Sequence, residues 1–244
     1  MFKRQRFGGA GGSAEREFRR QRRKNVRDDW HVWLFMSLGV TGLAVWSILV
    51  RGVGARVLAA AAGLLLGMLL VLWALGGHIS AFRWWLGAEG ERDTAGEIEN
   101  LGPEWHCEHD LEHDHGNWDH VLVGPAGVFL LDSKLLHGTV AAGEDALRSG
   151  RLTFAGGSFR YGAIRIKQLL EQRLGFRAPW VQAVAVVWGD FPQGRHEEQD
   201  VVYLRGDQLR TWLAELPEKM NAPQRAALVT ALQEIRESLR DGLR

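Results

Sequence analysis

The sequence has one cysteine, Cys107, among its 244 residues. A single thiol excludes an intrachain disulfide framework and is typical of a chain that works in a reducing compartment. Net charge is also small, because 30 basic and 29 acidic residues leave a formal charge of +1. With 46% apolar and 24% charged residues, the composition is globular, and the length suffices for one or two domains.

The small net charge conceals an uneven distribution along the chain. Residues 1–30 contain ten Lys or Arg and four acids, whereas the remaining 214 residues contain 20 basic and 25 acidic ones. The tail also contains the Gly-rich stretch 8–12, so we expect it to be disordered. Because the tail precedes an uncharged run, its charge favours contact with anionic lipid over a role as a nucleic-acid arm.

Charged residues are missing from two long runs, 32–50 and 57–82. Each run meets the length of a helix that crosses a hydrocarbon core, about 20 residues. A six-residue connector, 51–56, would join the two helices as an antiparallel hairpin. A buried soluble hairpin is the alternative, as is a signal peptide, whose apolar region would be shorter. We therefore predict a transmembrane helical hairpin over residues 31–82.

The basic residues also predict the orientation of the hairpin. Ten of them precede the first run and only two lie in the connector, which places both termini on the cytoplasmic side of the inner membrane. The expected partners of this part are the lipid bilayer and a second copy of the chain, bound through the transmembrane helices. The predicted domains are the basic tail 1–30, the hairpin 31–82, an α/β domain 83–205 and a helical extension 206–244.

Beyond residue 83 the hydrophobic pattern alternates between strand and helix periods. The predicted helices cover 90–101, which Gly102-Pro103 ends, 159–174, which Gly175 ends, and 223–239. The predicted strands cover 104–112, 118–124, 128–134, 181–188 and 201–204, with a more polar hairpin around 138–155. We therefore expect an α/β fold in which a mixed sheet is flanked by helices.

The segment 118–134 predicts an antiparallel hairpin with a turn at residues 124–127. If the turn centre lies between Pro125 and Ala126, Asp119 faces Asp132 across the ladder. Lys134 lies on the same face because strand side chains alternate.

Two opposed carboxylates repel one another, so the pair should hold a cation. The cation could be the Lys134 ammonium or a divalent metal, and oxygen ligands favour Mg²⁺ or Mn²⁺. Glu91, near the start of the predicted helix 90–101, could supply a further oxygen. In the alternative, Asp119 caps the neighbouring turn while Asp132 and Lys134 form an ordinary surface ion pair.

Several segments together resemble the nuclease-related domain (NERD), a family of the restriction-endonuclease-like PD-(D/E)xK superfamily. They are residues 87–91, 118–123, 127–134 and Gly138, and the resemblance covers roughly 86–190. Position by position, Glu91 matches the helix glutamate, Asp119 the first strand acid, Asp132 the second acid and Lys134 the lysine. Asp132 stands where the family more often has Glu, and residues 158–162 stand where it often has Asn-Pro-x-x-Gln.

The resemblance implies a restriction-endonuclease-like fold and a metal-dependent phosphodiesterase that acts on nucleic acid. Glu91, Asp119 and Asp132 would hold one or two Mg²⁺ (or Mn²⁺) ions, and Lys134 would orient or deprotonate the attacking water and stabilise charge on phosphorus. Two alternatives remain. The chain could be a membrane-tethered module that binds nucleic acid or protein without cleavage, or an accessory to transport whose hairpin oligomerises.

Two further features are left open by the sequence. The segment 106–120 contains Cys107 and five histidines, which could form a zinc site: His106, His109, His113, His115 and His120. Because His106 and His109 would point to opposite faces of a strand, a polar loop around 110–116 is the simpler interpretation. Seven basic residues follow the proposed site and could contact phosphates or form a solvated face: Arg148, Arg151, Arg160, Arg165, Lys167, Arg173 and Arg177.

Overall fold

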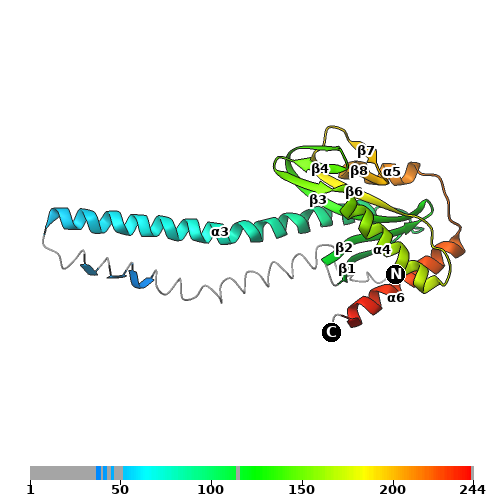
Figure 1. Ribbon diagram of the computed structural model, residues 1–244, viewed down its shortest axis with the longest axis horizontal. Helices are drawn as coiled ribbons and strands as arrows, with labels where there is room; N and C mark the ends of the chain where they lie inside the picture. The colour runs from blue at the N-terminus through cyan, green and yellow to red at the C-terminus, as the bar shows by residue number, and fades with distance from the viewer. Residues whose placement is uncertain (1–36, 40, 43–44, 47–51, 114–115, 243–244) are drawn as a thin grey trace. The chain divides into compact units, whose positions relative to one another are not determined.

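The computed structural model describes residues 37–39, 41–42, 45–46, 52–113 and 116–242 (Figure 1). The chain divides into two compact units, and Leu86 begins the part that holds all the strands. The predicted basic tail and 12 of the 19 residues of the first uncharged run, 32–50, lie outside the described residues. In the part of the chain that is described, no helix is both long and apolar enough to cross a membrane.

The first long element is a single helix, α3, from Val53 to Glu99. It contains the second uncharged run, 57–82, and it already includes the last residues of the expected connector 51–56. The prediction of a separate helix over 90–101 was wrong, because α3 continues through that region without a break. Glu91 therefore lies inside a helix, one turn before Ala95, and not at a helix start.

Gly90 was expected at the start of a helix but lies inside α3, and its packing explains why. A Cβ atom at this position would lie 3.1 Å from the Cβ of Leu135 and 3.2 Å from its backbone nitrogen. The missing side chain thus allows α3 to approach a strand closely, which outweighs the helix propensity that glycine costs, about 1 kcal/mol. The close approach brings the next residue, Glu91, to the same strand.

The remaining elements are eight strands and three α-helices in an α/β arrangement. The strands are β1 (His106–His113), β2 (Gly116–Gly124), β3 (Gly127–Gly143), β4 (Ala146–Ser149), β5 (Leu152–Ala155), β6 (Val181–Asp190), β7 (Arg195–Glu198) and β8 (Val201–Arg205). The helices are α4 (Gly156–Leu174), α5 (Leu209–Glu215) and α6 (Ala222–Gly242), with a 3-10 turn at Gly206–Gln208. The expected mixed sheet is thus confirmed, whereas β7 and α5 were not predicted.

The strands form one mixed sheet in the order β1-β2-β3-β6-β8-β7. β1, β2 and β3 pair antiparallel, β3 pairs parallel with β6, and β6 pairs parallel with β8. The second half of β3 pairs with β4, and β4 pairs with β5, which accounts for the polar hairpin expected around 138–155. The connection from β3 to β6 then runs through α4, as parallel neighbours require a crossover.

Helices cover both faces of the sheet (Figure 1). On one face, α4 and α6 bury apolar side chains such as Ile166, Leu170 and Leu232 against the alternating residues of β2 and β3. On the other face, the end of α3 and α5 pack through Ile98 and Trp212. This three-layer arrangement places the β2–β3 hairpin between α4 on one side and α3 on the other.

Candidate active site

The β2–β3 hairpin has the register that its turn predicts. Val123 pairs with Val128 and Val121 with Leu130, and the ladder ends at His120 and Leu131. Beyond this point β3 continues beside β6, while β2 continues beside β1, so the two strands separate. Asp119 is the first β2 residue beyond the shared ladder.

Asp119 bridges the gap where β2 and β3 separate. Its Oδ2 accepts a hydrogen bond from the backbone N–H of Ser133 at 2.8 Å. This bond replaces the backbone pairing that β2 no longer supplies to β3. It also holds the Asp119 carboxylate beside Asp132 and Lys134, the two neighbours of Ser133 in the chain.

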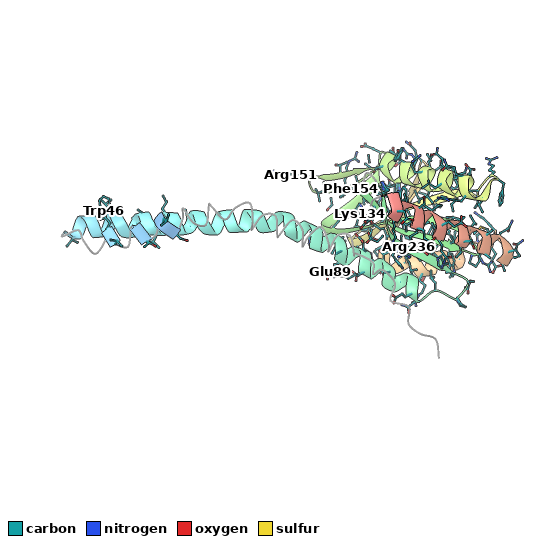
Figure 2. All side chains as sticks on the ribbon, turned by 90° about the horizontal axis from the view of Figure 1, so that it is seen from below. Trp46, Glu89, Lys134, Arg151, Phe154 and Arg236 are labelled. Carbon is teal, nitrogen blue, oxygen red and sulfur yellow. The ribbon has the colours of Figure 1, made fainter. Side chains whose placement is uncertain are left out.

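Asp132 and Lys134 form an ion pair on the face of β3 that is covered by α4. The Lys134 ammonium also lies over two aromatic rings, 5.5 Å from the centre of Phe154 and 5.8 Å from that of Phe159. Figure 2 labels Lys134 and Phe154 among the side chains of this unit. Cation–π contacts of this kind favour the charged form of the amine. Lys134 is only 23% exposed, so its charge is directed at the site and not at bulk water.

Neighbouring charges shift the pKa of two of the four residues expected to form the site, Asp119 and Lys134. Partial burial, followed by the charges of Asp132 and Glu91, raises the pKa of Asp119 well above its ordinary value, although Lys134 and the Ser133 amide oppose this. Burial would lower the pKa of Lys134, but Asp132, Asp119 and Glu91 outweigh it and raise that pKa. Three carboxyl groups and one ammonium therefore share one charged cluster.

A buried hydroxyl network joins α3 to the sheet beside this cluster. The Oγ1 atom of Thr94 accepts hydrogen bonds from Ser133 Oγ and from Trp188 Nε1, both at 2.8 Å. Thr94 in turn donates to the backbone carbonyl of Gly90 at 3.0 Å. Because Glu91 follows Gly90, this network fixes the position of Glu91 relative to β3.

The sequence did not single out Thr94, Ser133 or Trp188, although one signal was available. Ser133 lies between Asp132 and Lys134, so strand alternation directs it to the opposite face of the sheet. Thr94 follows Glu91 by one helical turn and therefore shares its side of α3. Alternation and helix spacing together would have identified a polar contact between them.

A cavity of about 470 Å³ opens on the α4 side of the cluster. Asp119 and Asp132 line one wall of this cavity. The opposite wall comes from α4, where Gly162 allows close packing: a Cβ there would lie 2.7 Å from Leu130 Cδ2. The cavity lining also includes His113, Trp118, Phe159, Tyr161, Arg165 and Leu239.

Some of the basic residues that follow the site in the sequence form ion pairs with acids, and one contacts a neutral side chain instead. Arg148 pairs with Glu144, Arg160 with Asp145 and Lys167 with Glu171. Arg165 instead donates to the neutral side chain of Gln168 at 3.1 Å, and it lines the cavity. Of these four, Arg165 therefore presents its positive charge to the candidate site.

A group of side chains with metal-ligand geometry lies on the β1–β2 pair. Among the described residues, one group of His, Cys, Asp or Glu side chains has three ligand atoms within 4.8 Å of one another: Cys107, His109 and His120. The oxygens of Glu91, Asp119 and Asp132 are more widely spaced, and the Lys134 ammonium neutralises Asp132. The expected loop over 110–116 is shorter than predicted, because β1 extends to His113 and β2 begins at Gly116.

One of three comparisons with known proteins gives a match. Comparison with curated proteins and with solved structures finds no match. A family model described as the nuclease-related domain matches residues 86–188, from the C-terminal part of α3 to β6. This range includes Glu91, Asp119, Asp132 and Lys134. Over residues 86–188 the chain is therefore similar to the nuclease-related domain family, as the sequence resemblance predicted.

Proposed function

We propose that this protein hydrolyses phosphodiester bonds of nucleic acid with the help of a divalent metal. The observation that carries the proposal is the cluster of three carboxyl groups and one ammonium, of which Asp119 and Asp132 line a cavity. The cluster lies within the segment that matches the nuclease-related domain. The separation of β2 and β3 at this point, with an acid on each strand and Asp-x-Lys on the second, supports a restriction-endonuclease-like PD-(D/E)xK arrangement.

The donor set fits a hard metal ion. Glu91, Asp119 and Asp132 offer only carboxylate oxygens, the ligands that Mg²⁺ and Mn²⁺ prefer. Their mutual repulsion, which raises the pKa of Asp119, would be relieved by a divalent cation. When bound, such an ion polarises a phosphate and lowers the pKa of a coordinated water.

Lys134 supplies positive charge to the reaction. Its pKa is raised, so the amine is protonated at neutral pH and serves better as an electrostatic stabiliser than as a base. This favours one of the two roles that the sequence left open for Lys134. Located between Asp132 and two phenylalanine rings, the ammonium stabilises the negative charge that develops on the phosphate oxygens.

The cavity supplies groups that suit a nucleic-acid strand. Arg165 can pair with a backbone phosphate, and a guanidinium matches phosphate geometry well. Trp118 and Tyr161 present aromatic rings on which bases can stack without sequence preference. His113 stacks on Trp118, with ring centroids 4.2 Å apart, and thereby supports that ring.

A cleavage assay on the full chain tests this function. Labelled single-stranded DNA, duplex DNA and RNA are incubated with the protein in Mg²⁺, Mn²⁺ or chelator. We expect cleavage of at least one substrate that requires metal and is lost in Asp132→Asn. Lys167→Gln is the matched control, since it removes a paired surface charge on α4, and it should cleave like wild type.

The same preparations distinguish a binding module from an enzyme. Binding of the three nucleic acids without cleavage in any metal would show the non-catalytic module and overturn the nuclease proposal. A melting temperature that rises with Mg²⁺ in wild type but not in Asp132→Asn would assign the metal to the proposed carboxylates. An equal rise in both proteins would place the metal elsewhere.

We further propose that the chain is anchored in the cytoplasmic membrane with both termini in the cytoplasm. The uncharged runs 32–50 and 57–82 and the basic residues before them support this. Several apolar side chains of α3 are also exposed, with Leu58 at 73% and Leu64 at 77%. Lipid, or a second copy of the chain, would cover them.

Fusion reporters test this orientation. A cytoplasmic reporter fused after Arg244 should be active, and a periplasmic reporter at the same position should be silent. The reverse result would contradict the proposed topology. Recovery of the full chain in the soluble fraction would contradict the membrane anchor itself.

A further inference from the structure

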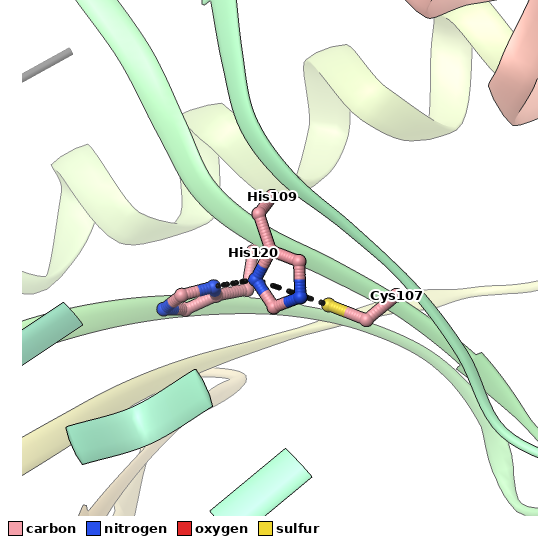
Figure 3. A group of neighbouring side chains, drawn as sticks. All are labelled: Cys107, His109 and His120. Carbon is pink, nitrogen blue, oxygen red and sulfur yellow. Dashed lines mark hydrogen bonds between the residues drawn. The ribbon is translucent and has the colours of Figure 1, made fainter. Parts of the chain in front are cut away.

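Cys107, His109 and His120 gather on one face of the β1–β2 pair (Figure 3). Cys107 and His109 are two residues apart on β1 and so point to the same side of the sheet. His109 pairs directly with His120 on β2. His106, which the sequence analysis compared with His109, points away and contacts Glu108 at 2.9 Å.

The three ligand atoms lie close to the positions that a tetrahedral metal requires. His109 Nδ1 is 2.7 Å from His120 Nδ1 and 3.9 Å from Cys107 Sγ. With tetrahedral angles and ordinary zinc bond lengths, two nitrogen ligands lie about 3.3 Å apart, and nitrogen and sulfur about 3.6 Å. Side-chain shifts of about 0.6 Å or less would therefore bring both of these pairs to coordination distances. All three ligand atoms lie within 4.8 Å of one another.

The side chains of this cluster differ in their burial. His120 is completely buried, and its Nε2 atom has no hydrogen-bond partner. Cys107 and His109 are partly exposed. A metal bound through His120 Nδ1, the atom that faces His109, would fix the orientation of this buried ring.

We propose that Cys107, His109 and His120 bind a borderline divalent metal, for which Zn²⁺ is the best match. One thiolate and two imidazoles are ligands that Zn²⁺ prefers over Mg²⁺. On binding, the Cys107 thiol forms a bond to the metal and releases its proton to solvent. Three protein ligands leave a fourth position for water.

This site is separate from the proposed carboxylate site, although both use β2. Asp119 lines the α4-side cavity, whereas the neighbouring His120 points to the face covered by the end of α3. The backbone of Glu91 lies beside the His120 ring. A metal held by His120 would thus stiffen the strand that carries Asp119, next to the helix that carries Glu91.

Metal titration of the full chain tests the proposal independently of any nuclease activity. The protein is stripped with a chelator and titrated with Zn²⁺, and with Co²⁺ as a spectroscopic probe. We expect one equivalent of Zn²⁺ to bind, to raise the melting temperature, and to release protons. Bound Co²⁺ should give the charge-transfer absorption of a thiolate ligand.

Variants assign the ligands. Cys107→Ser should lose the thiolate absorption, and His109→Gln should weaken Zn²⁺ binding by more than about tenfold. His106→Gln is the matched control, because His106 is on the same strand but faces the other side, and it should bind Zn²⁺ like wild type. Both ligand variants keep polar side chains at partly exposed positions, so their folding is checked by circular dichroism before titration.

Three results would overturn the proposal. They are a wild-type protein that binds neither Zn²⁺ nor Co²⁺, Zn²⁺ binding that is unchanged in both Cys107→Ser and His109→Gln, and a Co²⁺ complex without thiolate absorption. Loss of Mg²⁺-dependent cleavage would not bear on this site, since Zn²⁺ binding is measured without substrate.

Discussion

Neighbouring groups act in opposite directions on the protonation of Asp119, which lies where β2 and β3 separate. Partial burial and two neighbouring carboxyl groups favour its protonated form, whereas Lys134 and the Ser133 amide favour the charged form. A carboxylate that served only as a local cap would not be placed beside two other acids, since neighbouring like charges disfavour the ionised form. We therefore interpret the repulsion among these carboxyl groups as a feature of a site that binds cations.

The pKa of a second carboxyl group, that of Asp145, is shifted in the opposite direction to that of Asp119, which leads to a prediction on how stability depends on pH. Asp145, in the turn between β3 and β4, accepts hydrogen bonds from Arg160 at 2.5 and 2.7 Å. The hydrogen bond to this guanidinium lowers the pKa of Asp145 below its ordinary value of 3.8. The contribution of this pair to stability is therefore present above the unfolded pKa and is lost as pH falls through the folded pKa.

Asp145→Asn should lower the midpoint of urea unfolding at pH 7. It should have progressively less effect as the pH falls through the folded pKa, because Asp145 of the wild type then also becomes neutral. Asparagine tolerates the left-handed conformation at this position, φ 53°, so the variant isolates the charge. An equal loss of stability at pH 7 and below the folded pKa would show that the pair does not act through ionisation.

At the scale of single elements, two tight turns hold non-glycine residues in the left-handed region. Gln199 and Asp200, between β7 and β8, have φ values of 44° and 64°. Both values are positive in a two-residue loop, which is a type I′ turn, and such turns favour glycine at the second position. The Asp200 carbonyl also accepts a hydrogen bond from Gln182 at 2.8 Å, which any residue there can retain.

Asp200→Gly should stabilise the protein by about 0.5 kcal/mol, because glycine adopts this φ without steric cost. Asp200→Ala is the control and should destabilise it, since alanine keeps the Cβ but cannot make the local hydrogen bonds of aspartate. Urea unfolding of the three proteins measures both effects. Greater stability of Asp200→Ala would show that the turn conformation is not the cause.

The sequence predicted those elements well whose position depends on a local signal, such as a turn or a cap residue. The β2–β3 register followed from the turn at 124–127, because a turn position determines which residues pair. Helix α4 ends at Gly175, which has φ 71° as a C-cap glycine should.

Other elements depended on contacts that no local pattern records. Gly90 looked like a helix start, but its lack of a side chain serves packing against Leu135 and the helix continues. β7, with the sequence Arg-His-Glu-Glu, has no apolar alternation and becomes a strand because it pairs with β8. The Cys107–His109–His120 cluster required knowledge that β1 pairs with β2 in one particular register.

At the scale of the whole unit, the fold extends beyond the matched domain. The family match ends at residue 188, but α6 contributes Leu228, Leu232 and Ile235 to the main core. Leu239 of α6 also lines the cavity beside the candidate site. The C-terminal helix is therefore part of the structure that shapes the site.

One buried ion pair joins this helix to the far edge of the sheet. Arg236 of α6 binds Glu108 of β1, whose side chain is only 5% exposed. Arg236→Met should destabilise the protein by about 3 kcal/mol, because it leaves the Glu108 carboxylate with less compensation.

Adding Glu108→Gln to Arg236→Met should restore part of that loss. A double-mutant cycle from urea unfolding measures the coupling between the two side chains. If the changes in unfolding free energy caused by the two substitutions were strictly additive, the pair would make no direct contribution to the docking of α6.

The most direct test of the account is the rate of metal-dependent cleavage by Lys134→Met. Methionine keeps an unbranched stem of similar length but removes the ammonium that Asp132, Asp119 and the two phenylalanine rings hold in place. The variant should fold, and its melting temperature should still rise with Mg²⁺. Its cleavage rate should fall by about 10² to 10³-fold, and Lys134→Arg should not restore it. Cleavage by Lys134→Met at the wild-type rate would contradict the proposed active site.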